Sequence, residues 1–343
     1  MNALALSQTA RRLLDDDKGL LAIDESNATC NKRFAANGIP ETLAARRAYR
    51  ELIITTPLLN ESISGVILYD ETIRQQTDDG RAFAGILAGA GITPGIKVDI
   101  GAKALAGHPG ETITEGLDGL RERLLEYRQL GARFAKWRAV IALGDGMPSS
   151  GCIEANAHAL ARYAGLCQDA GVVPVVEAEI LMEGDHSLER CRDATDKVLQ
   201  AVFEQLYGQR VMLEGMILKP NMVLSGLASV KQETVDEVAD ATLNCLMRVV
   251  PAAVAGIAFL SGGQSSELAS ARLNAMNIRS KAAGSRVPWP LAFSFARAIQ
   301  QPALEIWRGK EANVSAAQRA LYRQANFNRL ARRGEFTEAM EAA

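Results

Sequence analysis

The chain has 343 residues, of which 48% are hydrophobic and 23% are charged, a composition typical of a globular protein with a sizeable core. Its 38 basic and 40 acidic residues nearly cancel, which argues against nucleic acid or an anionic membrane as a partner and favours a small ligand. The amino-terminal stretch has no long apolar core, so we expect neither a signal peptide nor a membrane span.

Eight short β-rich runs follow one another along the chain, and most of the stretches between them have helical patterns. Eight such units in more than about 250 residues fit a closed parallel (β/α)8 (TIM) barrel better than a doubly wound sheet. Because no linker or repeat divides the chain, we predict a single α/β barrel domain over residues 1–343, with a short N-terminal helix and a short C-terminal tail. The predicted strands are 20–24, 65–69, 95–99, 133–140, 172–179, 212–219, 256–260 and Leu291–Phe295.

Three of the intervening helices have clear patterns. In residues 187–207, apolar or weakly polar residues recur three or four positions apart and face charged ones, which is typical of an amphipathic helix. Two further helices are predicted at 117–130 and 155–170. They end before Gly131 and Gly171, and glycine at such a position suits a left-handed helix cap.

Ionisable and hydroxyl side chains gather at the carboxyl ends of the predicted strands, where (β/α)8 enzymes carry their chemistry. A single charged residue at a strand end is more often a solvated terminus than a functional group. Seven strands that end in this way would be costly for a scaffold, because buried charge destabilises a fold unless it is paired. The residues are Asp24, Glu25, Ser26, Lys97, Asp99, Lys136, Arg138, Glu177, Glu179, Lys219, Ser261, Gly262, Gly263, Ser294 and Arg297.

Lys219 is the candidate nucleophile because it closes an apolar strand and points toward the barrel mouth. Burial beside other cations such as Lys136 and Arg138 would favour its neutral amine, which can attack a carbonyl. Glu177 and Glu179 lie on one face of their strand and would serve as proton shuttles. These residues predict Schiff-base chemistry.

A phosphate site is predicted near the last two strands. Ser261, Gly262 and Gly263 would offer a hydroxyl and backbone N–H groups, and Arg297 a permanent positive charge. Alone, the Ser-Gly-Gly run would more often be an ordinary tight turn.

No metal or other cofactor is expected. His108, His158 and His186 have no metal-ligand spacing with another histidine or cysteine, and we expect them in loops or on helices. The five cysteines are scattered, with no C-x-x-C pair, which indicates reduced thiols and a cytoplasmic location.

The sequence resembles class I fructose-bisphosphate aldolase over nearly its whole length. The motifs that carry the resemblance are AIDES (22–26), GIKVD (95–99), GLDGL (116–120), FAKWR (134–138), GDH (184–186), LKPNM (218–222) and FLSGGQS (259–265). The resemblance implies a metal-independent lyase of glycolysis and gluconeogenesis that reversibly cleaves fructose 1,6-bisphosphate to dihydroxyacetone phosphate and glyceraldehyde 3-phosphate. It also implies a homo-oligomer, commonly a tetramer.

Residue roles follow from the same resemblance. Lys219 would form the Schiff base, Glu177 would transfer protons during its formation, and Asp24 would take the proton of the C4 hydroxyl. Lys136 and Glu179 would tune and orient Lys219. One phosphate would contact Ser261, Gly262, Gly263, Ser294 and Arg297, with Arg33 nearby, and the other would contact Ser26, Thr29, Lys97 and Arg138.

Four features depart from the family pattern. Ala178 replaces a proline, Ala296 a glycine and Ile100 a lysine, and the C-terminal sequence lacks the terminal tyrosine that animal relatives use to move the enamine proton. This leaves two alternatives open: a Schiff-base aldolase for another phosphorylated ketose, such as fructose 1-phosphate or sedoheptulose bisphosphate, and a non-catalytic barrel that serves as a scaffold.

Overall fold

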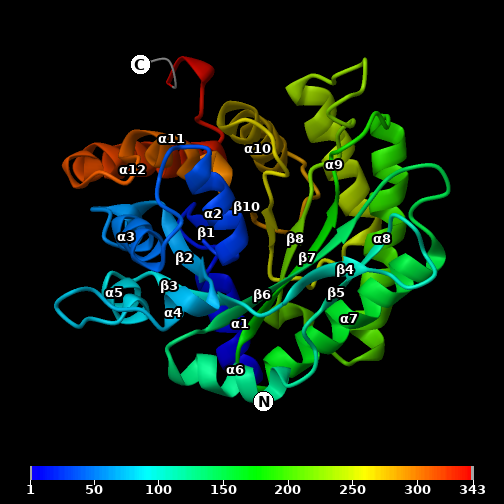
Figure 1. Cartoon of the computed structure of the whole chain (residues 1–343). Helices are drawn as coiled ribbons and strands as arrows, with labels where there is room; N and C mark the ends of the chain where they lie inside the picture. The colour runs from blue at the N-terminus through cyan, green and yellow to red at the C-terminus, as the bar shows by residue number, and fades with distance from the viewer. Residues whose placement is uncertain (1, 341–343) are drawn as a thin grey trace.

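The computed structural model describes residues 2–340, and at its centre is a closed barrel of parallel strands (Figure 1). Around the barrel the order is β1-β10-β9-β8-β7-β6-β3-β2, so β2 lies opposite β8. Every strand predicted from the sequence is present, which confirms the (β/α)8 fold. The barrel strands are β1 (Gly19–Ala22), β2 (Ile63–Leu68), β3 (Thr93–Lys97), β6 (Phe134–Ile141), β7 (Val173–Ile180), β8 (Ile217–Pro220), β9 (Ile257–Phe259) and β10 (Leu291–Phe295).

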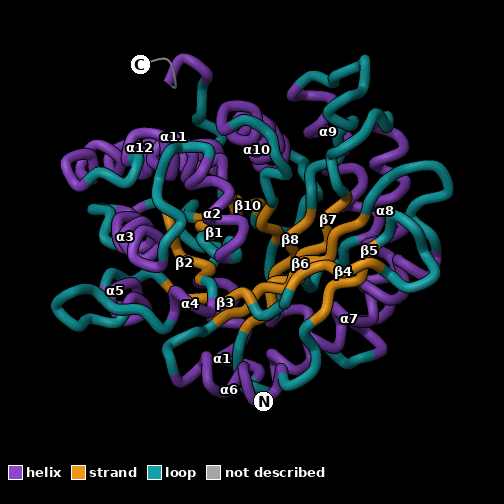
Figure 2. The backbone as a smooth tube through the Cα atoms, viewed as in Figure 1, coloured by secondary structure: helices purple, strands orange, loops and turns teal. Residues whose placement is uncertain are grey.

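Helices surround the barrel and cover the outer faces of its strands (Figure 2). Among the described residues, no helix is both long enough and apolar enough to cross a membrane. The α-helices are α1 (Ala3–Arg12), α2 (Asn27–Ala35), α3 (Leu43–Ile54), α4 (Asp70–Ile73), α5 (Phe83–Gly89), α6 (Leu120–Gln129), α7 (Ser150–Asp169), α8 (Leu188–Gly208), α9 (Val235–Val249), α10 (Ser266–Lys281), α11 (Arg297–Trp307) and α12 (Val314–Arg333). Short 3-10 helices are η1 (Leu59–Glu61), η2 (Leu213–Gly215), η3 (Glu311–Asn313) and η4 (Glu338–Met340).

The three predicted helices correspond to α6, α7 and α8. Gly131 and Gly171 follow the first two with φ angles of 108° and 70°, the left-handed conformation expected of a cap. Helix α7 begins five residues before its predicted start because Ser149 caps it: the Ser149 hydroxyl accepts a hydrogen bond from the backbone N–H of Cys152 at 3.1 Å.

The barrel interior has its own apolar core, separate from the larger core between the strands and the outer helices. Strand residues such as Ile67, Phe134 and Ile217 fill it, and α1 closes it from the amino-terminal end with Leu6. Gly95 makes room for this packing, since a Cβ atom there would lie 2.3 Å from the ring of Phe134.

The carboxyl-terminal helix α12 seals the seam between β1 and β10. Its buried Arg332 donates hydrogen bonds to the backbone carbonyls of Leu291 and Leu14, both at 3.0 Å, and to that of Lys18. Burial lowers the pKa of Arg332 to about 10, although two nearby aspartates oppose the shift. The guanidinium thus ties the start of β10 to the segment that leads into β1.

One predicted strand needs correction, and one hairpin was not predicted. The predicted strand 212–219 begins with η2, where the Gly215 N–H donates to the Met212 carbonyl at 3.1 Å, and only its second half is β8. An antiparallel hairpin of β4 (Gly101–Ala104) and β5 (Thr112–Glu115) also follows β3. Its first strand, GAKA, is largely exposed and has no β-branched residue, so no pattern along the chain predicts a strand there.

The predicted C-terminal tail falls partly outside the described residues, because 341–343 are not among them. His108 and His186 lie in loops and His158 lies on α7, as expected. All five cysteines are buried and free of disulfides.

Candidate active site

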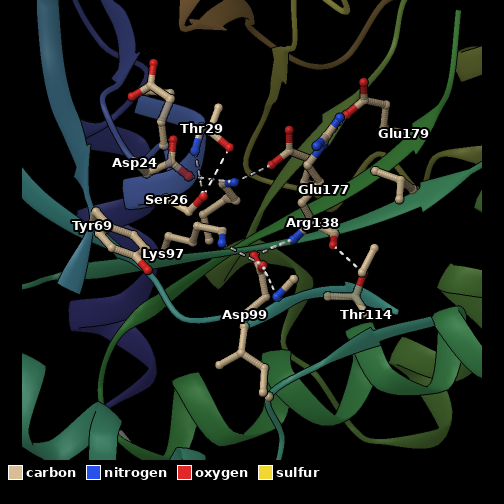
Figure 3. Close-up of a pocket in the computed structure, with 18 of the residues that line it drawn as sticks. Asp24, Ser26, Thr29, Tyr69, Lys97, Asp99, Thr114, Arg138, Glu177 and Glu179 are labelled. Atoms are coloured by element: carbon tan, nitrogen blue, oxygen red, sulfur yellow. Dashed lines mark hydrogen bonds and ion pairs between the residues drawn. The ribbon is translucent and has the colours of Figure 1, made fainter. Parts of the chain in front are cut away.

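An open cleft of about 1660 Å³ lies at the carboxyl ends of the barrel strands. It is where a (β/α)8 enzyme is expected to hold its substrate. Every residue that the sequence analysis assigned to the site lines this cleft, and Figure 3 shows several of them: Asp24, Ser26, Thr29, Arg33, Lys97, Lys136, Arg138, Glu177, Glu179, Lys219, Ser261, Gly262, Gly263, Ser294 and Arg297.

Lys219 lies on β8 inside the cleft and is only 3% exposed. Its Nζ atom is 3.1 Å from Oε1 of Glu177, its register partner on β7. The sequence had suggested that neighbouring cations favour the free amine of Lys219. The structure adds a direct contact with Glu177, through which that carboxylate can accept the Lys219 proton.

Lys136 connects the two carboxylates of the site. Its Nζ atom lies 2.7 Å from Oδ2 of Asp24 and 3.2 Å from Oε2 of Glu177. Burial alone would raise the pKa of Asp24, but Lys136, Lys219 and Lys97 outweigh it and lower that pKa from 3.8 to about 2. Both carboxylates are therefore ionised at neutral pH.

The charges of this cluster, which consists of Asp24, Lys136, Glu177 and Lys219, also shift the pKa values of Lys136 and Glu177. Burial would lower the pKa of Lys136, but Asp24 and Glu177 raise it above its usual 10.5. Burial would raise the pKa of Glu177, but Lys136, Lys219 and Arg138 lower it below its usual 4.5. A buried cluster of alternating charges of this kind loses stability when any one partner is removed.

Arg138 and Glu179 form the next ion pair along β6 and β7. The Arg138 Nε atom donates to Oε2 of Glu179 at 2.5 Å. Burial would lower the pKa of Arg138, but Glu179 raises it. Glu179, which the resemblance assigns to orienting Lys219, thus has its ion pair with the cation predicted to bind phosphate.

Lys97 lies on β3, which is three strands from β8 around the barrel. Its Nζ atom is 3.0 Å from Oδ1 of Asp99, and Asp99 also accepts hydrogen bonds from the backbone N–H groups of Arg138 and Gly101, both at 3.2 Å. Asp99 therefore holds Lys97 and the end of β6 in a fixed arrangement (Figure 3).

Ser26 and Thr29 lie at the amino terminus of α2, which faces the cleft. Ser26 is the N-cap: its hydroxyl accepts from the Thr29 N–H at 3.3 Å and lies 3.1 Å from the Thr29 hydroxyl. The free N–H groups and hydroxyls at such a helix start suit an anion.

The turn after β9 and the end of β10 form a second anion-binding surface. Gly262 and Gly263 have φ angles of 58° and 92°, the left-handed region that favours glycine. A Cβ at Gly262 would lie 2.8 Å from Sδ of Met182. The buried hydroxyl of Ser294 lines the cleft and has no hydrogen-bond partner among the described residues, which is the state expected of a donor reserved for a ligand.

Arg33 lies on α2 at the cleft wall, with part of its charge already paired. It contacts the carboxylate of Glu25 and donates from NH1 to Gln300 Oε1 at 3.2 Å. Arg50 approaches the other oxygen of Glu25 at 3.0 Å, so two arginines share one carboxylate. The cluster keeps a net positive charge next to the cleft.

Comparison with known proteins assigns this geometry to a family. The family model for fructose-bisphosphate aldolase class-I matches residues 5–343. This chain belongs to the class I fructose-bisphosphate aldolase family. It is 53% identical over 337 residues to a probable fructose-bisphosphate aldolase class 1 of Xanthomonas campestris, covering 98% of this chain and 99% of that protein.

More distant members of the family also match this chain over nearly its whole length. The chain is 48% identical to fructose-bisphosphate aldolase 3, chloroplastic, of Arabidopsis thaliana, over 97% of this chain and 83% of that protein. A solved structure of fructose-bisphosphate aldolase from Plasmodium falciparum, in complex with TRAP and a small-molecule inhibitor, superposes with a TM-score of 0.95 at 43% identity, covering 98% and 96% of the two chains. The resemblance inferred from the sequence motifs is confirmed.

Some residues of this aldolase cleft were not among the predicted site residues. Lys32 lies one position before Arg33 and also lines the cleft, and Tyr69 lines it beside Lys97. Tyr69 ends the predicted strand 65–69, so it lies at the carboxyl end of a barrel strand like the predicted site residues. An aromatic residue is common within a strand, so its type alone does not indicate a site residue.

Among residues 2–340, no group of three or more histidine, cysteine, aspartate and glutamate side chains is arranged to hold a metal ion. The thiols lie away from the cleft, since no cysteine lines it. The ionisable groups of the cleft are therefore carboxylates, lysines, arginines and a few aromatic and imidazole side chains.

Proposed function

We propose that this chain is a Schiff-base aldolase that reversibly cleaves fructose 1,6-bisphosphate to dihydroxyacetone phosphate and glyceraldehyde 3-phosphate. The observation that carries the proposal is the buried contact of 3.1 Å between Lys219 and Glu177. Groups that suit a phosphate lie on both sides of this contact, and Asp24 stands close enough to share Lys136 with Glu177.

The first step forms the imine. The Lys219 ammonium passes a proton to Glu177, which leaves a neutral amine beside a carboxylic acid, and the amine attacks C2 of the ketose. One proton of the attacking nitrogen moves to the former carbonyl oxygen, which becomes the hydroxyl of the carbinolamine. The Glu177 acid then returns its proton to the departing hydroxyl, so that water leaves and the iminium forms. The net charge of the pair is unchanged by the transfer, so a buried site can accommodate it.

The second step breaks the C3–C4 bond. Asp24 accepts the proton of the C4 hydroxyl while the bonding electrons move into the iminium and give the enamine. The low pKa of Asp24, about 2, keeps it ionised and available at neutral pH. Lys136, 2.7 Å from Asp24, stabilises that ionised form.

Two phosphate sites are proposed on opposite sides of the cleft. The turn Ser261, Gly262, Gly263 follows β9, the neighbour of β8, and Ser294 and Arg297 lie on β10 and at the start of α11. This surface fits the C1 phosphate, which is attached through C1 to the imine carbon. Ser26, Thr29, Lys97 and Arg138 would receive the C6 phosphate, and Arg33 adds positive charge at the cleft wall.

The assembly and location of the protein are also proposals. We infer a single barrel domain that forms a homo-oligomer, a tetramer by analogy with the family, in the cytoplasm. Five free and buried cysteines support a reducing compartment. No cofactor is proposed. The phosphorylated sugar is the proposed partner.

Reductive trapping tests the chemistry. Sodium borohydride added with fructose 1,6-bisphosphate should leave a covalent adduct on Lys219, identified by peptide mass, and activity should persist in the presence of EDTA. Lys219→Met should still fold, with a lower unfolding free energy, and should abolish turnover. An unmodified lysine or a chelator-sensitive reaction would contradict the mechanism.

Turnover and trapping measurements on other ketose phosphates distinguish two alternative functions. Turnover of fructose 1-phosphate or sedoheptulose bisphosphate faster than that of fructose 1,6-bisphosphate would indicate another phosphorylated ketose as the substrate. A non-catalytic scaffold would show neither turnover nor trapping with any of them.

A further inference from the structure

Tyr69 is a cleft residue for which the proposed mechanism has no role. It directly follows β2, forms part of the cleft wall and is half-buried. Among residues 2–340 its hydroxyl makes no hydrogen bond, although Tyr127, also in the cleft, donates its own to Oδ1 of Asp70 at 2.9 Å. Tyr69 thus presents a free phenol to the space that the substrate would fill.

The environment of Tyr69 prepares it to meet an anion. The Lys97 ammonium lies 5.8 Å from the centre of the Tyr69 ring, on the side opposite its own partner Asp99 in the ion pair (Figure 3). Burial raises the pKa of Tyr69, and Asp70 and Glu71 raise it further, so the phenol keeps its proton at neutral pH and can donate it. A donor and a cation therefore lie side by side at one wall of the cleft.

The barrel order indicates which part of the substrate reaches this wall. Strand β2, which leads to Tyr69, is four strands from β8 in either direction and so lies directly across the barrel from Lys219. A ketose bound to Lys219 through C2 has its C1 phosphate near the imine and its C6 phosphate at the far end. The far end is the only charged part of the sugar that can extend across the cleft.

We propose that the Tyr69 hydroxyl, together with Lys97, binds the C6 phosphate and so favours a ketose bisphosphate over a ketose 1-phosphate. This inference rests on the proposed function. It assigns to the chain a specificity residue that donates one hydrogen bond to a phosphate oxygen, while the ring of Tyr69 holds the Lys97 ammonium in place.

The test compares Tyr69→Phe with the wild type on fructose 1,6-bisphosphate and fructose 1-phosphate. The variant keeps the ring over Lys97 and removes only the hydroxyl. We expect kcat/KM for the bisphosphate to fall about tenfold, mostly through KM, as for the loss of a hydrogen bond to a charged group. The value for fructose 1-phosphate should stay within about twofold of wild type. An equal fall on both substrates, or no fall on either, would overturn the proposal.

Tyr127→Phe is the matched control. It also removes a phenol hydroxyl from the cleft, but this hydroxyl already donates a hydrogen bond to Asp70. Its ratio of the two kcat/KM values should match that of the wild type. A binding measurement separates this inference from the proposed reaction: titration with hexitol 1,6-bisphosphate, which has no carbonyl, should show an affinity about tenfold lower for Tyr69→Phe alone. That result would hold even if borohydride failed to trap Lys219, and equal affinities would refute the role of Tyr69.

Discussion

Replacing Lys136 by methionine tests the electrostatic basis of the site directly. Lys136 is the buried cation between Asp24 and Glu177, at 2.7 Å and 3.2 Å. Methionine has a similar length and packs in an apolar environment, so the substitution removes the charge with little change in volume. The two buried carboxylates would then lose the cation that contacts both of them, and Lys219, Lys97 and Arg138 would remain as the compensating cations.

The size of the effect follows from the pKa of Asp24. Its shift from 3.8 to about 2 corresponds to about 2.5 kcal/mol of stability. Because the folded-state pKa is lowered, this contribution is present above about pH 4 and is lost as the pH falls through about 2. Without Lys136, burial dominates and raises the pKa of both carboxylates, so the stability advantage disappears. Breaking a buried pair of this kind costs about 3–5 kcal/mol.

The assay is a pH profile of kcat/KM together with urea unfolding at neutral pH. The acidic limb of the Lys136→Met profile should move upward by about two pH units or more, since Asp24 must be ionised to take the C4 proton. Lys136→Arg keeps the charge, so its acidic limb should stay near that of the wild type. A methionine variant with an unchanged acidic limb and unchanged unfolding free energy would refute the electrostatic account of the site.

Two further predictions separate stability from activity. Arg332→Met removes the donor to three carbonyls, two of them in buried hydrogen bonds, and should lower the unfolding free energy by about 2–4 kcal/mol in urea titrations. Adjacent Arg333→Met removes only partly exposed pairs with Asp17 and Glu335 and should cost less than about 1 kcal/mol. Ser294→Ala should leave stability unchanged but raise KM for fructose 1,6-bisphosphate about tenfold. Ser62→Ala, which also removes a buried hydroxyl without a partner but outside the cleft, should leave both unchanged; an equal KM change in both variants would contradict the phosphate role of Ser294.

The sequence was sufficient to predict the barrel and the residues of the cleft because both depend on patterns along one strand at a time. Apolar runs that end in Lys219 or Glu177 place these side chains at one edge of any parallel barrel. The pairing between side chains depends on neighbours from different strands, and this the sequence did not contain. The contacts of Lys219 with Glu177 and of Lys136 with Asp24 are of this kind.

The β4–β5 hairpin and the 3-10 turn before β8 were not predicted for a similar reason: their positions depend on contacts with residues distant in the sequence. The β4–β5 hairpin is exposed, so burial imposed no apolar pattern on it, and its position depends on contacts such as that of the Thr114 hydroxyl with the Arg138 carbonyl at 2.8 Å. The 3-10 turn before β8 is fixed by the Gln168 side chain, which donates to the carbonyl of Met212 at 2.8 Å from another helix. Such long-range contacts can override local preference.

The seam between β1 and β10 has a consequence for the synthesis of the chain. Leu20 pairs with Ser294, and the guanidinium that covers this junction belongs to α12, so the barrel cannot close until almost the entire polypeptide has left the ribosome. At about 5–20 residues per second, β1 waits for more than about ten seconds with an unpaired edge. During that time β1 has no partner at this edge, and a nascent chain cut short before β10 retains open strand edges that favour aggregation.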